Sequence, residues 1–241
     1  MKAVAQAIDK ESQGTYVLTS GTGLLFGYDL PRHSVDLDYD TLAKKDLAAV
    51  LKNAAEEISG EKAFVRLQKD AETFQRYFIR LAKEENPEIL KVEILLERPE
   101  LDIEKETFKK DGMTIYKLPI LAEQKLGTLL PWPDGRPGRM RVRDVFDAEF
   151  LFSKHPEAIK PEMGLKIKED LDRLGMGGLK KRLDDEIASN PKAMHLLRGK
   201  DPQAIILSLY AQLEKFAYNV EKGQVLNEKK EINQIVRTDE G

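Results

Sequence analysis

Three aspartates occupy alternate positions in one short stretch, at Asp36, Asp38 and Asp40. In an extended strand alternate side chains share a face, so the three carboxylates would lie together. Like charges a few ångströms apart repel one another unless a cation lies among them. The pattern therefore predicts a strand that binds a divalent cation on one face and packs into the core with the other. The core-facing residues would be Val35, Leu37 and Tyr39.

A run of small residues at positions 20–23, Ser-Gly-Thr-Gly, precedes these aspartates. Such a turn lets backbone N–H groups approach phosphate oxygens at the start of a helix. A metal-binding Asp-x-Asp beside a phosphate-binding turn is typical of nucleotidyl transfer, in which two Mg²⁺ ions stabilise the attacking and leaving oxygens. Asp-x-Asp alone is common on solvated strand edges, and it also holds Mn²⁺ and a sugar nucleotide in glycosyltransferases. The prediction therefore depends on the two motifs together.

A third carboxylate, Glu93, lies in the middle of an apolar segment at 89–96. A charge in that position is costly unless it is paired or coordinates a metal. We therefore expect Glu93 to be a third metal ligand on a strand next to that of Asp36 and Asp38. Arg80, at the end of the preceding strand, would lie across from it. The alternative is that Glu93 faces solvent on an antiparallel sheet.

The motifs follow a recognisable order along the chain. A small-residue turn with Thr is followed by an apolar half-helix, then Arg-x-Ser, then two aspartates that alternate with hydrophobic residues. These elements are Ser20-Gly21-Thr22, Leu24-Leu25-Phe26, Arg32-His33-Ser34 and Val35-Asp36-Leu37-Asp38. The series resembles the AbiEii/AbiGii toxin branch of the nucleotidyltransferase (DNA polymerase β-like) superfamily. Ser20 replaces the usual Gly, and Gly23 stands where Ala is common, which leaves phosphate binding possible but predicts a more flexible turn.

The resemblance covers roughly residues 15–155 and includes two later segments. Lys125 lies in a helix with the family's hydrophobic-x-x-Lys-Leu pattern, and the resemblance implies that it meets the nucleotide's phosphates. Residues 141–147 match the family's Arg-x-Arg/Lys-Asp-x-x-Asp signature, which implies that Arg143, Asp144 and Asp147 complete the pocket. The alternatives are a Lys125 that snorkels to the surface and an ordinary surface ion pair between Arg143 and Asp147.

The resemblance implies an enzyme that transfers NMP from an NTP to an acceptor hydroxyl, with Mg²⁺ (or Mn²⁺) as cofactor, and releases pyrophosphate. Asp36, Asp38 and Glu93 would hold the metal, and Glu93 is also a candidate base for the acceptor hydroxyl. The full catalytic set would be Asp36, Asp38, Glu93, Lys125, Asp144 and Asp147. The nucleotide-binding set would be Ser20, Gly21, Thr22, Arg32, Ser34, Lys125 and Arg143.

The resemblance also implies the toxin of a toxin–antitoxin or phage-defence system, with a cognate antitoxin as partner. Its acceptor, by analogy, would be RNA, at the 3′ end of tRNA. Fold does not fix substrate, so a protein or small-molecule acceptor is an open alternative. The replacements at Ser20 and Gly23 favour a further alternative, a catalytically silent nucleotide-binding module.

The composition is that of a globular chain, because 41% of its 241 residues are hydrophobic and 34% are charged. No apolar run approaches the roughly 20 residues that cross a membrane, and the N-terminus lacks a signal-peptide core. Cysteine is absent and the three histidines lack ligand spacing, so we expect no disulfide, no zinc and a cytoplasmic location. The net charge of −3 gives no general nucleic-acid signal, but residues 136–143 carry four arginines suited to an RNA backbone or the NTP.

The expected fold class is α/β (α+β), with a nucleotidyltransferase-like mixed sheet flanked by helices over 1–118 and a helical domain over 119–241. The active site would lie in the groove between them. Besides the carboxylate strand, the expected strands are 63–68, 73–81, 89–96 and 113–118. The expected helices are 2–12, a helix from Thr41 to about 58, 120–130, 141–153, 165–174, 179–189 and 202–220, with a glycine break at 175–178.

Overall fold

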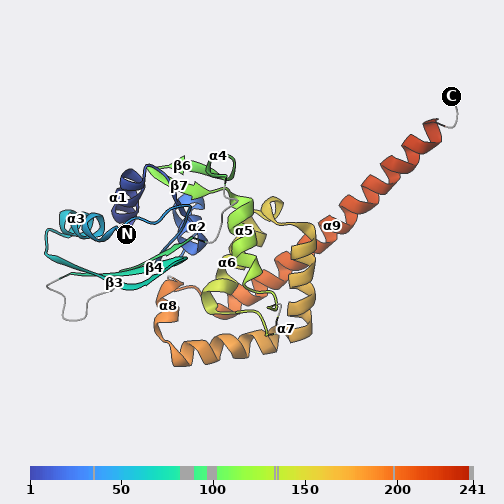
Figure 1. Cartoon of the computed structure of the whole chain (residues 1–241). Coiled ribbons are helices and arrows are strands. Elements are labelled where there is room, and N and C mark those ends of the chain that lie inside the picture. The colour runs from blue at the N-terminus through green and yellow to red at the C-terminus, as the bar shows by residue number, and fades with distance from the viewer. Residues whose placement is uncertain are drawn as a thin grey trace. The chain divides into compact units, whose positions relative to one another are not determined.

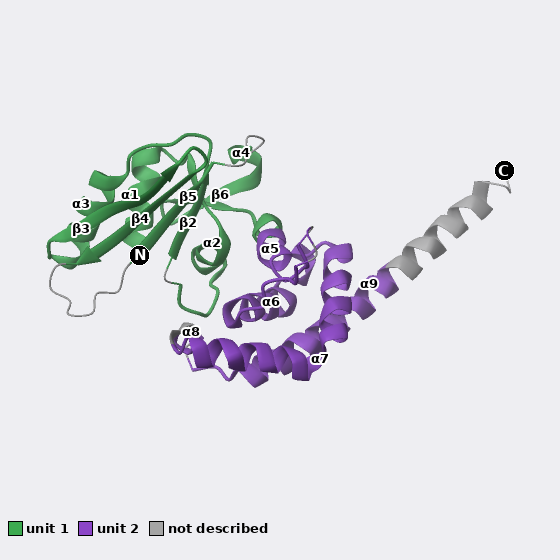
Figure 2. Cartoon of the chain, turned by 60° about the horizontal axis from the view of Figure 1, so that its bottom comes forward, with its two compact units in different colours: residues 1–121 green, residues 122–241 purple. Residues whose placement is uncertain are grey.

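Strand β2 (Asp36–Thr41), which carries the predicted carboxylates, is the central strand of the N-terminal sheet. The computed structural model describes residues 1–34, 36–81, 90–96, 102–132, 134, 136–197 and 199–238. Val35 and Ile89, from two predicted strands, therefore lie outside the described residues. The chain divides into two compact units, Met1–Leu121 and Ala122–Gly241, which Figure 2 shows in different colours. Each unit is considered by itself.

Unit 1 is built on a mixed sheet, as predicted. Among the described residues, seven strands follow the order β3-β4-β5-β2-β1-β7-β6. β2 is parallel to β5 and antiparallel to β1, and β1 is parallel to β7. On one side of β2, β4 is antiparallel to both β3 and β5. The other strands are β1 (Tyr16–Leu18), β3 (Ala63–Ala71), β4 (Phe74–Leu81), β5 (Leu90–Leu95), β6 (Thr107–Lys110) and β7 (Met113–Tyr116).

Helices α1 and α3 cover one face of this sheet (Figure 1). Just before α3, the backbone N–H of Leu47 donates to the Tyr77 hydroxyl of β4 (3.3 Å), and that of Lys45 donates to the Tyr16 hydroxyl of β1 (2.9 Å). Both tyrosines are fully buried, so this face of the sheet forms the core of the unit. The helices are α1 (Lys2–Ser12), α2 (Ser20–Tyr28), α3 (Ala48–Ser59) and α4 (Ile103–Glu106).

The helix after β2 begins later than the sequence indicates. Thr41 is the last residue of β2, and α3 begins at Ala48. The Thr41 hydroxyl bonds the backbone of Ala43, at 3.1 Å to the carbonyl and 3.3 Å to the N–H, and so does not cap a helix. Leu42, expected on the apolar face of that helix, is 50% exposed, whereas Leu47 is buried as expected.

Unit 2 is helical, as predicted. Helices α6 and α7 both pack against α9, and the Phe152 and Phe216 rings meet edge to face with centroids 5.2 Å apart. Gly175 interrupts α7 at φ 71° and ψ 156°, which confirms the predicted break. Within the described part of the chain, no helix is both long and apolar enough to span a membrane. The elements are α5 (Leu118–Gly127), which begins in unit 1, α6 (Val142–Lys154), η1 (Pro156–Ala158), α7 (Pro161–Ser189), α8 (Lys192–Leu196) and α9 (Pro202–Thr238).

Candidate active site

Asp36, Asp38 and Glu93 lie on the same face of the sheet, on two adjacent strands. β2 and β5 are parallel, and their register pairs Asp38 directly with Glu93. Directly paired residues point to the same side of a sheet, and Asp36 shares that side because it lies two residues from Asp38. The structure therefore brings together the three carboxylates that the sequence predicts as metal ligands.

Two cationic side chains of unit 1 contact these carboxylates. Lys91 of β5 bridges two of them, because its Nζ lies 3.2 Å from Asp36 Oδ2 and 2.7 Å from Glu93 Oε2. Arg76 of β4 is paired with Glu93 across the strands and contacts Glu93 Oε1 through Nε at 2.6 Å and Nη2 at 2.5 Å. The Glu93 carboxylate thus has one cation at each oxygen.

Arg80, expected across from Glu93, lies elsewhere. It pairs with Phe64 of β3, and its guanidinium lies over that ring at 5.5 Å from the centroid. The prediction was wrong because it placed Arg80 by the order of the segments. The register between β4 and β5 brings Arg76, four residues earlier, to Glu93 instead.

The charges at this cluster set the ionisation of its members. Burial opposes the charge on Glu93, but hydrogen bonds from Lys91 and Arg76 outweigh it and lower the pKa of the Glu93 carboxyl. Burial likewise opposes the charge on Lys91, but Glu93 and Asp36 outweigh it and raise the pKa of the Lys91 ammonium. At neutral pH both groups are therefore charged.

The cluster has the chemistry of a site for a hard divalent cation. Mg²⁺ and Mn²⁺ prefer carboxylate oxygens, and Asp36 and Glu93 already converge on one positive group, the Lys91 ammonium. Among the described side chains, no three acidic, histidine or cysteine residues form a ready-made ligand group. The three carboxylates therefore fit a divalent cation provided that Lys91 moves away from Asp36 and Glu93.

Asp40, the third aspartate of β2, does not join this cluster. It is buried, and its Oδ2 accepts a hydrogen bond from the Tyr116 hydroxyl at 2.8 Å. Its strand neighbours are Val17 and Leu95, so it lies in the interior of the sheet. A shared cation site for all three aspartates is therefore wrong.

The small-residue run forms the first turn of α2, with Thr19 at the N-cap. Thr22 is buried, and its hydroxyl donates to the Asp36 carbonyl (2.5 Å) and lies 3.1 Å from the Ser34 hydroxyl. These contacts tie the start of α2 to the start of β2. Ser20 has a left-handed backbone, with φ 57°, which suits the glycine usual in the family and costs a serine about 1–2 kcal/mol.

Two glycines of this turn lie close to neighbouring side chains. A Cβ on Gly21 would lie 2.3 Å from Nη2 of Arg32, a buried residue whose Nη1 donates to the His33 carbonyl at 2.7 Å. A Cβ on Gly23 would lie 2.9 Å from Cδ2 of Leu121 and 3.2 Å from the Leu18 carbonyl oxygen. An alanine at this position, which is common in the family, would therefore require the Leu121 side chain to shift.

The predicted residues of the C-terminal half form a second charged cluster, within unit 2. Lys125 Nζ lies 2.7 Å from Asp147 Oδ2 and 3.5 Å from Asp144 Oδ1. Arg139 binds Asp144 through two hydrogen bonds, Nε to Oδ2 at 2.8 Å and Nη2 to Oδ1 at 2.9 Å. Lys125 is 6% exposed and both aspartates are fully buried. Arg143, on the same helix α6, is partly buried.

Both alternatives for these residues are wrong. Lys125 does not snorkel to the surface, because its ammonium is buried against Asp147. Asp147 is buried as well, so an ordinary surface pair with Arg143 is excluded. Two arginines of the basic segment at 136–143 form ion pairs within the chain. Arg136 pairs with Asp134 (2.7 Å), and Arg139 pairs with the buried Asp144.

A family model described as "Nucleotidyl transferase AbiEii toxin, Type IV TA system" matches residues 5–207, a span that includes both charged clusters. The chain belongs to the AbiEii family. It is therefore a member of a family of nucleotidyltransferase toxins. No functionally curated protein gave a significant sequence match.

Solved structures share the fold of this AbiEii-family chain. A crystal structure described as that of a candidate nucleotidyltransferase from Helicobacter pylori is 25% identical, with a TM-score of 0.69, over 92% of this chain and 93% of that one. JHP933 from Helicobacter pylori is 24% identical, with a TM-score of 0.74, over 95% and 94%. MenT4, a nucleotidyltransferase toxin from Mycobacterium tuberculosis, is more distant, at 17% identity and a TM-score of 0.49 over 89% and 80%.

Sequence reasoning missed Lys91 and Arg76, and it placed Arg139 in the basic segment at 136–143 without predicting its contact with Asp144. Lys91 lies two residues before Glu93 on the same strand, so alternation alone places both on one face. That signal was available in the sequence. Arg76 and Arg139 have no such signal, because strand register and a loop conformation bring them to their carboxylates.

Proposed function

We propose that this protein is a metal-dependent nucleotidyltransferase that transfers NMP from an NTP to an acceptor hydroxyl. The observation that carries the proposal is the pairing of Asp38 with Glu93 on parallel neighbouring strands, with Asp36 on the same face. Three carboxylates on one sheet face repel one another, and a divalent cation would offset that repulsion where Lys91 and Arg76 do so in this structure. Membership of the AbiEii family supports nucleotidyl transfer as the use of that cation.

Asp36, Asp38 and Glu93 would hold the divalent cation, Mg²⁺ or Mn²⁺. A cation bound there would supply positive charge to offset the negative charge of the triphosphate and of the leaving pyrophosphate. Glu93 suits the role of ligand better than that of general base, because the lowered pKa of its carboxyl makes it a weak base. Lys91 and Arg76 hold Glu93 in position until the metal and nucleotide bind.

The first turn of α2 would bind the triphosphate through its backbone. N–H groups at a helix start lack partners within the helix and attract anions. Ser20 and Gly21 would contribute such groups, and Arg32 lies against Gly21 with its positive charge. Thr22 and Ser34 would act by fixing this turn to β2, since their hydroxyls bond each other and the Asp36 carbonyl.

The physiological role we propose is that of the toxin of a toxin–antitoxin pair, acting on RNA in the cytoplasm with the tRNA 3′ end as acceptor. The description of the AbiEii family as a type IV toxin–antitoxin system supports an antitoxin partner. As part of this proposal, Lys125 and Arg143 would contact the nucleotide, and Asp144 and Asp147 would belong to the catalytic set, as the resemblance implies.

Incubation with each radiolabelled NTP, Mg²⁺ and total RNA tests the reaction, with label expected in a tRNA-sized band. The Asp38→Asn variant is expected to lower the transfer rate by about 10²–10³, because it removes charge from the metal site. Asp111→Asn, at an exposed aspartate paired with Lys2, is the control and should keep full activity.

A catalytically silent nucleotide-binding module is the second candidate. It is favoured by the ion pairs that Asp36 and Glu93 make with Lys91. It predicts that no RNA, protein or small molecule takes up label and that Asp38→Asn changes neither NTP binding nor toxicity. Those results together would refute the transferase. Label in a protein fraction alone would keep the chemistry and refute the RNA acceptor.

A further inference from the structure

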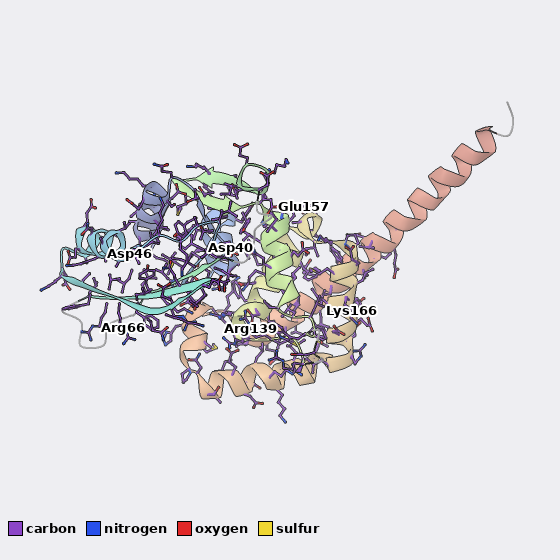
Figure 3. All side chains as sticks on the ribbon, in the orientation of Figure 1. Asp40, Asp46, Arg66, Arg139, Glu157 and Lys166 are labelled. Atoms are coloured by element: carbon purple, nitrogen blue, oxygen red, sulfur yellow. The ribbon has the colours of Figure 1, made fainter. Side chains whose placement is uncertain are left out.

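The two strands at the β3 edge of the sheet present alternating aromatic and basic side chains on one face. We call this surface the β3–β4 outer face, formed by Phe64, Arg66, Phe74, Arg76, Phe78 and Arg80. On β4 the four members are at every second position, so they share a side. Between them, Gln75, Tyr77 and Ile79 are buried on the other side, toward α3. Figure 3 shows Arg66 and Asp46, which precedes α3, on opposite sides of these strands.

Cations on this face lie over its aromatic rings. Arg66 lies 5.8 Å from the Phe78 centroid, Arg80 lies 5.5 Å from that of Phe64, and Arg76 lies 5.1 Å from that of Phe74. A single such pair is an ordinary surface contact. Three in succession across two strands form a ladder in which each ring has a guanidinium beside it. Phe64 is nevertheless 48% exposed, so a large apolar surface remains open to a partner.

The outer face continues into the candidate active site. Strand register aligns Arg66, Phe78, Lys91 and Asp36 in one row across β3, β4, β5 and β2. Paired residues share a side of the sheet, so the outer face and the carboxylates lie on one continuous surface of unit 1. A strand-like ligand bound along the row would reach the carboxylates without leaving the sheet.

We propose that the β3–β4 outer face binds single-stranded RNA, with bases stacked on its phenylalanines and phosphates held by its arginines. An apolar protein partner would have to bury the guanidinium groups, and an acidic one would offer nothing to the rings. A nucleic acid strand supplies both π-faces and negative charge. Single strands fit better than duplexes, because only unstacked bases expose their faces. The proposal rests on the proposed function only in choosing RNA, the acceptor, as the nucleic acid.

Binding of a fluorescein-labelled single-stranded RNA of about ten nucleotides, followed by anisotropy with the full chain, tests the charge contribution. No NTP or divalent metal is added. The Arg66→Gln/Arg80→Gln variant is expected to bind about tenfold more weakly. The slope of log affinity against log salt concentration should become shallower by about 0.7 for each charge lost. The control Lys2→Gln/Lys105→Gln removes the same charge at exposed lysines paired with Asp111 and Asp102, and should bind like the wild type.

A second pair of substitutions tests stacking. Phe64→Leu/Phe78→Leu keeps apolar side chains but removes the rings, and is expected to weaken binding about tenfold without changing the salt dependence. Circular dichroism checks that each variant is folded. Wild-type affinity in both folded double variants would overturn the proposal. So would equal competition by duplex RNA or polyglutamate, since either result describes a general charged surface.

Nucleotide transfer is measured on the same proteins, so that this proposal and the proposed function fail separately. Binding of a fluorescent NTP analogue should be unchanged in both double variants, because Asp36 and Asp38 are intact. A wild type that binds RNA through this face but transfers no nucleotide would refute the function and keep the surface. Transfer to RNA that both double variants perform at the wild-type rate would keep the function and refute the surface.

Discussion

Lys91 is the residue that decides the state of the carboxylates. Its ammonium lies between Asp36 and Glu93, at 3.2 and 2.7 Å, where a divalent cation would bring the same oxygens together. The lysine relieves their repulsion when no metal is present, and it competes with a metal for them. We therefore expect Lys91 to oppose metal binding at these carboxylates.

Replacing Lys91 by Met is expected to strengthen Mn²⁺ binding about fivefold, because a partly exposed ion pair is worth up to about 1 kcal/mol. Isothermal titration with Mn²⁺ alone, without NTP, measures this directly. Lys105→Met, at an exposed lysine paired with Asp102, serves as control and should leave the affinity unchanged. An unchanged or weaker affinity in Lys91→Met would show that Lys91 does not compete with the metal.

At the scale of elements, α5 and α6 are joined by buried charge. Lys125 of α5 contacts Asp147 and Asp144 of α6, and Arg139 holds Asp144 from the preceding loop. Removing one partner of a buried pair leaves a charge with too little compensation, at a cost of about 3–5 kcal/mol. Lys125→Met is therefore expected to lower the free energy of unfolding by that amount, measured in urea.

Two comparisons separate this structural role from phosphate binding. Lys160→Met, at an exposed pair with Glu123, should leave the free energy of unfolding close to that of the wild type. The double variant Lys125→Met/Asp147→Asn should recover part of the loss, because it removes the uncompensated charge. A Lys125→Met protein with wild-type stability and lost NTP binding would keep the proposed nucleotide contact and contradict the structural role of the lysine.

The elements that the sequence predicts well are those with a strong local signal. The α1 helix, the break at Gly175 and the alternation of Leu37 and Tyr39 against the aspartates follow from periodicity or glycine alone. The late start of α3 and the short β6 strand do not, because tertiary pairing decides them. β6 has only four residues and forms by pairing with β7, as in Thr107 with Tyr116.

The candidate site was also predictable only where the signal is local in sequence. That Asp36 and Asp38 share a face follows from spacing, and the charge of Glu93 in an apolar segment marks it out. Which cation meets Glu93 depends on the register of β4, which the sequence does not encode locally. The outer face of β3 and β4 was missed for the same reason: its two halves are separate in sequence and only pairing makes them one surface.

At the scale of the whole molecule, buried and partly buried tyrosines in both units set an alkaline limit to stability. Burial raises the pKa of each of these tyrosines above the ordinary 10.0, most strongly for Tyr39. The group comprises Tyr16, Tyr28, Tyr39, Tyr77 and Tyr210. The folded state holds these protons more tightly than the unfolded state, so their contribution is complete below pH 10 and is lost as pH rises through the folded pKa values. The pKa of the Glu93 carboxyl is lowered, so its contribution to stability has the opposite pH dependence. That contribution is present above pH 4.5 and is lost as the pH falls below this value.

Tyr39 and Tyr116 offer a matched test of the alkaline limit. The Tyr39 hydroxyl is buried and has no hydrogen-bond partner among the described residues, so Tyr39→Phe should raise the free energy of unfolding by about 1 kcal/mol at pH 7, and by more above pH 10. Tyr116→Phe should lower it by about 1–3 kcal/mol, because the buried Asp40 loses a donor. Urea unfolding at both pH values, with tyrosinate absorbance as the probe of ionisation, measures the changes. Equal losses in the two variants would mean that the Tyr39 hydroxyl stabilises the folded state as a hydrogen-bonded group does, which would contradict the prediction.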